Sequence, residues 1–295
     1  MNKKNKVLLT SIGLALFSGI AATSTTFAWF STVQNASVSF SNATVTTEDN
    51  SLAIEYVSSR NDLSHSETVS NDLELSGLNK ITDVSSEGLT FLKPEWTPSN
   101  PSVAYEINEV GASDADGFYI DFTINISRTE VGTNGMKVYL GENTLISPVG
   151  AADAEDLLAV QAARMAVIGY SDGSASTGTE SVKLIYAPVA ETVMVEEVET
   201  PDYDYLAIGD EEDAAYGLDG YKVADIASPV VNSFVSYNDI ADVGSTIAIA
   251  DLSTATSVDV TFRAWLEGED AQAVNSAIGG VFNIALDIYG LTVSA

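Results

Sequence analysis

The segment 117–127, GFYIDFTINIS, places an apolar side chain at every second position without an error. Its alternating apolar residues are Phe118, Ile120, Phe122, Ile124 and Ile126. This period predicts a β-strand with one buried face, because successive side chains of a strand point to opposite sides. A chain that contains such a strand must bury that face against a second layer, which favours a packed sheet.

Several other segments show the same period and predict further strands. They are 36–47, 52–57, 136–140, two strands within 181–198, 245–252, 257–268 and 281–293. In the first, the alternation slips at Ser41 and Asn42, which indicates a bulge or a bend. In 257–268, the predicted inner face holds Val258, Val260, Phe262, Ala264 and Leu266, and the predicted outer face holds Asp259, Thr261, Arg263 and Trp265.

One segment has a helical period and predicts an amphipathic helix at about 153–168. Its apolar residues at helical spacing are Leu157, Leu158, Ala162, Met165, Ala166 and Ile168. Asp153, Glu155 and Asp156 stand at its start, where negative charge favours the helix dipole. Gly169 stands near the predicted end.

Many strands, one helix and several long polar segments predict a mainly β fold, namely a jelly-roll-like β-sandwich with long loop insertions. We expect one domain over 29–295, with insertions near 58–101 and 199–242. Residues 58–88 are expected to hold at most one short helix or strand. The segment 93–102, KPEWTPSNPS, contains three prolines and is therefore expected to form a loop or a sheet edge.

The first 28 residues have the order of a secretory signal peptide. Three lysines precede an apolar run of about 16 residues, and Thr26-Phe27-Ala28 provides the small residues of a cleavage site. Because a helix needs roughly 20 apolar residues to cross a bilayer, we expect cleavage between Ala28 and Trp29, with a retained anchor as the alternative. The predicted product is exported to the cell surface or extracellular matrix, with signal peptidase as a partner and no membrane attachment after cleavage.

The charge balance excludes several partners. The chain has 12 Lys and Arg against 42 Asp and Glu, and cleavage would remove three lysines, leaving 9 against 42, a formal charge of −33. Such a surface repels nucleic acid and anionic lipid, so neither is an expected partner. It favours solubility and cation binding.

The residue inventory also predicts that the protein is not an enzyme. With no cysteine, thiol catalysis and thiolate metal sites are excluded. The single histidine, His65, lies in a polar stretch and is expected in a solvated loop. Hydrolysis of the Ser-His-Asp type would require His65, and no phosphate-binding glycine loop is present. A carboxylate pair acting on glycosides remains open, but nothing in the sequence singles one out.

Two acidic stretches are candidate calcium sites, because calcium prefers hard oxygen ligands. The candidate ligands are Asp114, Asp116, Asp210, Glu212 and Asp213. Neither stretch matches the twelve-residue calcium loop, and solvated acidic loops are the alternative. Trp265 and the tyrosine-rich segment 203–221 are candidate platforms for carbohydrate stacking, with packing or interface roles as the alternative.

Two segments resemble a known family. TSTTFAWFSTVQNASVSFSNATV, near the start, resembles the N-termini of the TasA/camelysin group of exported Gram-positive surface proteins, which are cleaved by a SipW-type signal peptidase. VDVTFRAWLEGEDAQAVNSAIGGVFNIALDIYG is similar to a C-terminal segment of large relatives that carry an R-x-W-x-E-G-x-D run. Here this run is Arg263, Trp265, Glu267, Gly268 and Asp270. Together the two segments cover about a fifth of the chain.

The resemblance implies an exported jelly-roll domain, and for some members a fibre. In such fibres an N-terminal strand freed by cleavage completes the sheet of the next subunit, which is β-augmentation. The strand with Val38, Phe40 and Val45 would be the donor here, or else simply the first strand of the sandwich. The expected function is therefore a structural matrix protein that partners itself. The alternative is a surface adhesin or a calcium-dependent glycan-binding module.

Overall fold

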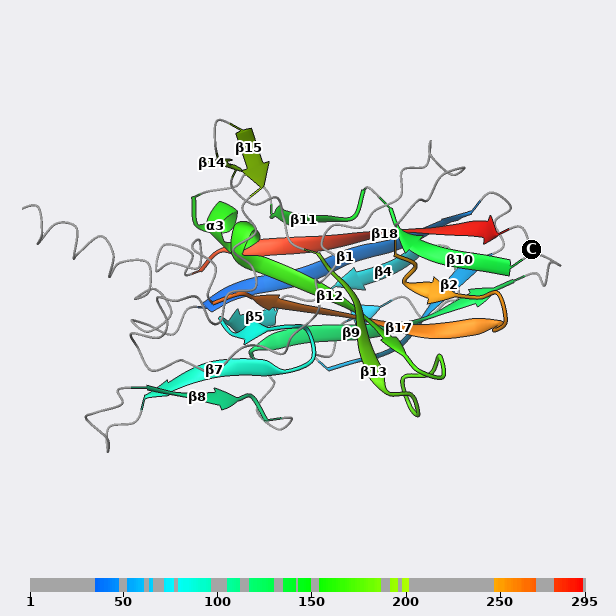
Figure 1. The fold of residues 1–295 in the computed structure, drawn as a ribbon, viewed down its shortest axis with the longest axis horizontal. Helices are drawn as coiled ribbons and strands as arrows, with labels where there is room; N and C mark the ends of the chain where they lie inside the picture. Colours follow the sequence, from blue (N-terminus) through cyan, green and yellow to red (C-terminus); the bar gives the residue numbers. More distant parts are fainter. Residues whose placement is uncertain are drawn as a thin grey trace, which may run out of the picture.

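The computed structural model describes residues 35–47, 52–60, 64–65, 72–76, 79–96, 105–111, 117–129, 135–141, 143–149, 154–186, 192–195, 198–201, 247–268 and 279–293. These residues are mostly β-strand in mainly antiparallel sheets, with one α-helix, so the predicted mainly β class is confirmed. Figure 1 shows the long strands of two sheets running in roughly the same direction across the molecule.

The larger sheet has eight strands, and the first and last long strands among the described residues lie side by side within it. Its order is β16 (Ala250–Asp251), β10 (Gly135–Leu140), β18 (Val281–Val293), β1 (Asn35–Thr47), β4 (Asp72–Ser76) and β3 (Ser64–His65), with β5 (Asn79–Thr82) beside β1 and β11 (Leu145–Pro148) beside β18. β1 runs parallel to β18, whereas the other strand ladders among the described residues are antiparallel. The register of this parallel pair shifts between Phe40 and Ala43, which confirms the predicted slip at 41–42.

The smaller sheet has five antiparallel strands. Its order is β13 (Glu180–Tyr186), β12 (Ala163–Tyr170), β17 (Ser257–Leu266), β9 (Tyr119–Arg128) and β2 (Leu52–Ser59). β9 is the strand predicted from perfect alternation, and it pairs with β17 on one side and β2 on the other. β17 confirms the strand predicted at 257–268.

One hydrophobic core joins the two sheets. The Phe40 ring of β1 meets the Phe122 ring of β9 edge-on, with centroids 4.5 Å apart, and Phe122 stacks on Phe262 of β17 at 5.3 Å. The predicted inner-face residues of β9 are fully buried there, except Phe118, which precedes the strand and packs against a second cluster instead. The alternation therefore identified the core face, and failed only where the strand had not yet begun.

A third, three-stranded sheet covers the opposite face of the smaller sheet. It consists of β6 (Ser85–Ser86), β7 (Phe91–Trp96) and β8 (Tyr105–Glu109). Its Val84, Phe91 and Val110 share a second cluster with the side chains of the smaller sheet that point away from the main core. We call the described residues 84–96 and 105–110 the cover. A separate hairpin pairs β14 (Thr192–Val195) with β15 (Val198–Pro201).

The prediction of at most one short element in residues 58–88 was wrong. β4 and β5 extend the larger sheet beside β1, and β3 and β6 also lie in this range. The sparse apolar residues of the range are core residues, because Leu73, Leu75 and Ile81 are buried between the sheets. Pro94 lies within β7 and pairs with β8 on one side. No described strand pairs with its other side, because the pairing of β7 with β6 stops at Leu92. The proline therefore stands at a sheet edge, which was one of the two predicted alternatives.

The predicted helix at 153–168 is wrong in its second half. Helix α3 spans Ala154–Ala162, and β12 begins at Ala163 with no residue between them. Residues 163–169 are buried on both faces of an interior strand and are apolar except for Arg164, so they show no alternation, and pairing with β13 and β17 overrides the helical spacing. In the part of the chain that the structure describes, no helix has the length and apolarity that crossing a membrane would need.

Candidate functional site

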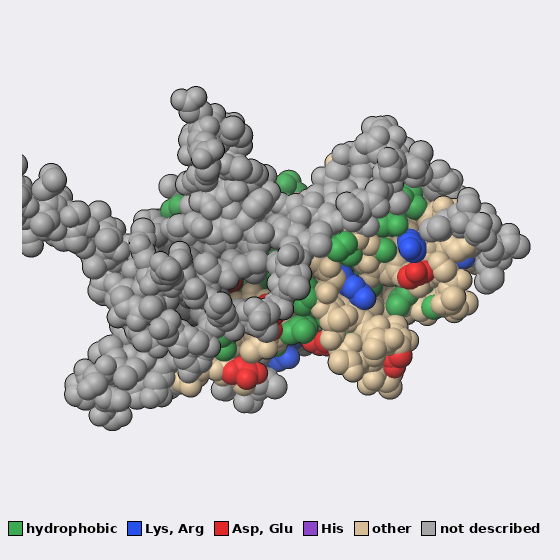
Figure 2. All heavy atoms as spheres, viewed as in Figure 1, with side chains coloured by type: hydrophobic (Ala, Val, Ile, Leu, Met, Phe, Trp, Pro, Cys, Tyr) green, Lys and Arg blue, Asp and Glu red, His purple; other side chains and the backbone are tan. Residues whose placement is uncertain are grey.

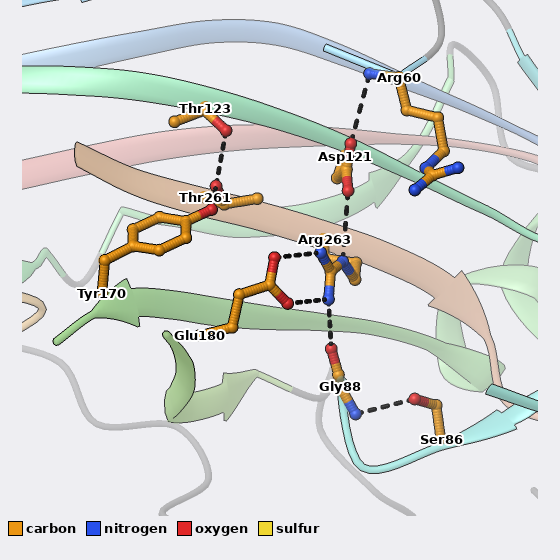
Figure 3. Close-up of polar contacts among 9 residues, drawn as sticks. All are labelled: Arg60, Ser86, Gly88, Asp121, Thr123, Tyr170, Glu180, Thr261 and Arg263. Atoms are coloured by element: carbon orange, nitrogen blue, oxygen red, sulfur yellow. Dashed lines mark hydrogen bonds and ion pairs between the residues drawn. The ribbon is translucent and has the colours of Figure 1, made fainter. Parts of the chain in front are cut away.

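The outer face of β17 carries Arg263 and Trp265 of the R-x-W-x-E-G-x-D run. The polar and charged side chains of this face lie in rows with those of β9. The register sets Asp259 beside Asn125, Thr261 beside Thr123, Arg263 beside Asp121 and Trp265 beside Tyr119. Figure 3 shows that Tyr170 of β12, Glu180 of β13 and Gly88 of the cover reach the same face. The motif therefore lies where the cover meets the sheet.

Arg263 is the centre of this face, with only 6% of its surface exposed. Its guanidinium donates to both carboxylate oxygens of Glu180, at 3.2 and 3.1 Å, and to Asp121 Oδ2 at 3.3 Å. Burial alone would lower the pKa of Arg263, but the hydrogen bonds and charges of Glu180 and Asp121 outweigh it and leave that pKa raised. The arginine thus stays charged, and its two-pronged bond to Glu180 fixes its direction.

The same guanidinium fastens the cover to the sheet. Arg263 Nη1 donates to the Gly88 carbonyl oxygen at 3.0 Å. Gly88 has φ +95°, and a Cβ placed on it would lie 2.8 Å from the Ala166 Cβ, so the turn can sit this close only with glycine. The Ser86 hydroxyl closes the turn, accepting from the Gly88 amide at 2.8 Å and donating to the Thr90 carbonyl at 2.7 Å. Figure 3 shows this chain of contacts from sheet to turn.

Trp265 and Glu267 form a second attachment point. Trp265 Nε1 donates to Glu267 Oε2 at 3.0 Å, and the Ser86 amide donates to the same oxygen at 3.3 Å. Both Trp265 and Glu267 are 1% exposed. The backbone of Val84 bonds on both sides, to the Leu266 carbonyl and from the Gly268 amide, each at 3.0 Å. The proposal that Trp265 is a surface platform for carbohydrate was therefore wrong, because the cover buries it.

Tyr119 joins the aromatic and the charged parts of this face. Its ring stacks on Phe91 of the cover with centroids 4.1 Å apart, and the guanidinium groups of Arg60 and Arg263 lie 5.0 and 5.4 Å from its ring centroid. Burial raises the pKa of Tyr119, against the opposing effect of the two arginines. The phenol is thus neutral at pH 7, and it offers its ring to both an aromatic partner and cations.

Further along, the outer face is held by hydroxyl groups. Thr261 Oγ1 lies 2.6 Å from both Thr123 Oγ1 and the Tyr170 hydroxyl. Burial raises the pKa of Tyr170, although its bond to Thr261 acts in the opposite direction. The next row is closed by Asp259, which accepts from Asn125 Nδ2 at 2.7 Å and from the Ala175 amide at 2.8 Å. The polar groups of these rows bond to one another, which suits an attachment surface better than an open binding site.

Sequence reasoning found the motif residues on β17 but missed their partners. Glu180 begins β13 after a Gly/Ser/Thr loop, and Gly88 lies in a segment expected to be irregular. Asp121 gave the one usable signal, because it is the charged residue in the outer alternation of 117–127 and could have been matched to Arg263 as a cross-strand ion pair.

The predicted donor strand occupies an interior position of the larger sheet. The β1 backbone pairs with β18 on one side and with β4 and β5 on the other. Phe40 is buried in the main core, and the backbones of Val38 and Val45 pair with Phe282 and Ile288. Removing β1 would therefore leave a row of unpaired backbone groups on each neighbour and an empty place against Phe122.

The remaining predicted site residues lie outside the described residues. They are Ala28 and Trp29 of the cleavage site, Asp114, Asp116, Asp210, Glu212 and Asp213 of the calcium candidates, Asp270 of the motif, and the tyrosine-rich segment 203–221. Within the described ranges, no group of three or more Asp, Glu or His side chains is arranged to hold a metal ion, and calcium stays a prediction. His65, expected in a loop, lies in β3 and pairs with Leu75 of β4.

The described surface shows no broad apolar area on the face drawn in Figure 2, where hydrophobic side chains are scattered among polar and charged ones. Comparisons with protein-family models, with curated proteins and with solved structures gave no match to this chain. The resemblance to the TasA/camelysin group accordingly rests on the two sequence segments alone.

Proposed function

We propose that this chain is an exported structural protein of the cell surface or extracellular matrix, which assembles into fibres by donating β1 to a neighbouring copy. The proposal includes a jelly-roll arrangement of the two sheets, membership of the TasA/camelysin group, and cleavage between Ala28 and Trp29. The observation that carries it is the interior position of β1, between β18 and the pair β4 and β5.

An interior strand at the start of the described chain suits donation, because a neighbour's β1 can make the same contacts as the chain's own. Exchange of an identical element keeps the same strand pairing and the same buried surface. The equilibrium between the closed monomer and the assembly therefore depends mainly on protein concentration and on the connection between β1 and β2. The connection from Thr47 to Leu52, at the start of β2 in the other sheet, is short. Short connections between elements favour exchange when they are strained.

The register supplies specificity for such a donation. The bulge between Phe40 and Ala43 matches only one alignment along β18, and the Phe40 ring fits edge-on against Phe122. A slip by one residue would turn every core-facing side chain of β1 outward. We therefore expect a donated strand to settle in one register, parallel to β18.

Disulfide trapping tests the donation directly, because the chain has no cysteine of its own. Ser39 pairs with Asn283 across the β1–β18 ladder. Single variants Ser39→Cys and Asn283→Cys, expressed from Trp29 onward, mixed under denaturant, refolded together and oxidised, should give a heterodimer that grows with concentration. The variant pair Ser37→Cys and Asn283→Cys is the matched control, since it shares the strands but is two positions out of register.

Two results would remove the proposal. In one, the in-register mixture gives no more heterodimer than the control, while a chain with both Ser39→Cys and Asn283→Cys forms its internal disulfide. In the other, the chain remains monomeric by light scattering at high concentration, with and without calcium, and electron microscopy shows no fibres. A mass measurement of the exported product tests the cleavage site separately.

A further inference from the structure

The junction of α3 and β12 combines two kinds of secondary structure without a break. The helix ends at Ala162 and the strand starts at Ala163. Residues 154–168 contain neither glycine nor proline, so nothing local stops the helix at this point. The helical spacing that predicted one continuous helix over 153–168 is a property of these residues, even though the folded structure does not use it.

The first half of β12 has the composition of a helix rather than of a strand. Ala163, Arg164, Met165 and Ala166 are good helix formers, and alanine is depleted in strands. The fold requires these residues for packing. Met165 is buried in the main core. The Ala166 Cβ would lie only 2.8 Å from a Cβ added to Gly88, so a larger side chain at position 166 would leave no room for the Gly88 turn.

The strand form of this segment depends on two partners: β13, which follows after residues 171–179, and β17, which comes much later in the chain. β12 lies between β13 and β17, and Ala163 pairs with Leu266. A helix needs only its own residues and forms within about 1 μs, whereas pairing over a long sequence separation is slow. Until β17 arrives, one edge of β12, whose side chains are apolar apart from Arg164 and Tyr170, would stay unpaired, which favours aggregation, while a helix satisfies its own backbone groups.

We infer that residues 154–168 first form one continuous helix, and that its second half converts into β12 when β17 pairs with it. The helix is a holding state that keeps this interior strand of the smaller sheet from pairing wrongly before the rest of the sheet exists. This inference does not depend on strand donation, because β12 belongs to the sheet that does not contain β1.

Refolding of the chain from urea, followed by pulsed hydrogen exchange and mass spectrometry, tests the order of events. We expect the amides of 163–168 to gain protection within the mixing time, before those of 257–266. Far-UV circular dichroism at 222 nm should transiently exceed the native signal and then decay as 257–266 becomes protected. Simultaneous protection of the two segments, without an excess signal, would overturn the inference.

Substitutions at Met165 test whether this segment produces the excess signal. Met165→Ile keeps the volume but disfavours the helix, and should reduce the transient signal by at least one half. Met165→Leu, a good helix former, should preserve it. Met136→Ile makes the same change at a buried position of β10, outside the helical pattern, and should also preserve it. An excess that is equal in all three variants would come from elsewhere in the chain, and the inference would fail.

Discussion

The two faces of β17 are both buried, but by different kinds of interaction. Inward, Phe262, Ala264 and Leu266 pack into the main core through apolar contacts alone. Outward, Arg263, Trp265 and Glu267 hold the cover through ion pairs and directed hydrogen bonds. Apolar burial contributes most of the free energy of folding but is not directional. The outer face fixes one turn at one place, which non-directional packing cannot do.

The largest effect is expected from the inner face. Phe262→Ala should lower the free energy of unfolding by about 3–5 kcal/mol, because it removes a buried ring that stacks on Phe122 and leaves a cavity. Urea denaturation measures this loss. Val258→Ala, on the same face where the strand is only partly buried, is the control and should cost about 1 kcal/mol. Equal losses in the two variants would contradict the assignment of the core.

Arg263→Ala should have the next largest effect on the free energy of unfolding, and its effect should be concentrated in the cover. It removes the donor to Asp121 Oδ2 and to the Gly88 carbonyl oxygen, and we expect a loss of about 2–3 kcal/mol, below the range for fully buried pairs because the Glu180 side chain is 40% exposed. Hydrogen exchange should accelerate in 84–96 more than in 119–128. Arg263→Lys keeps the positive charge but not the planar, two-pronged guanidinium. Its stability should therefore lie between those of the wild type and Arg263→Ala. Uniform acceleration would show that Arg263 serves the whole sheet rather than the cover.

Gly88→Ala should disturb the cover with a smaller loss. We expect about 1–2 kcal/mol from a side chain at φ +95° that also collides with Ala166. Ala166→Gly in the same chain relieves the collision but not the backbone strain, so a double-mutant cycle in urea should show partial rescue. No coupling between the two substitutions would mean that the turn shifts away rather than pressing on β12.

The smallest effect at neutral pH is expected from replacing a buried tyrosine, and the cost of this replacement shrinks in alkali. Burial raises the pKa of Tyr186, in the main core, above its ordinary value of 10.0, and a bond with the Ile146 backbone acts in the opposite direction. Because the folded pKa is the higher one, this contribution is complete below pH 10 and is lost as pH rises through the folded pKa. Tyr186→Phe should cost about 1 kcal/mol at pH 7 yet lose less stability than the wild type above pH 10. Tyr170→Phe, on the outer face, is the comparison variant for the same measurement. An identical loss of stability above pH 10 in Tyr186→Phe and in the wild type would contradict the prediction.

Strand positions and the core face could be predicted from the sequence wherever one face is apolar and the other polar. β9 and β17 were located in this way, and the slip at 41–42 was seen as a break in the alternation. β12 could not be identified, because it is buried on both faces and its apolar residues do not alternate with polar ones. The partners of Arg263 could not be assigned either, since Glu180 and Gly88 are brought to it by strand order, which the local pattern does not contain.

The parallel pairing of β1 with β18 gives the larger sheet a direction. Ser37 lies beside Val281 and Thr47 beside Gly290, so both strands start at one end of the sheet and run toward the other (Figure 1). At about 3.3 Å per residue, a strand of 13 residues spans roughly 40 Å. A fluorescent or affinity label placed after β18 would therefore emerge about that far from the residues that precede β1. Such a label can mark one pole of each molecule and reveal whether neighbouring copies in an assembly point the same way.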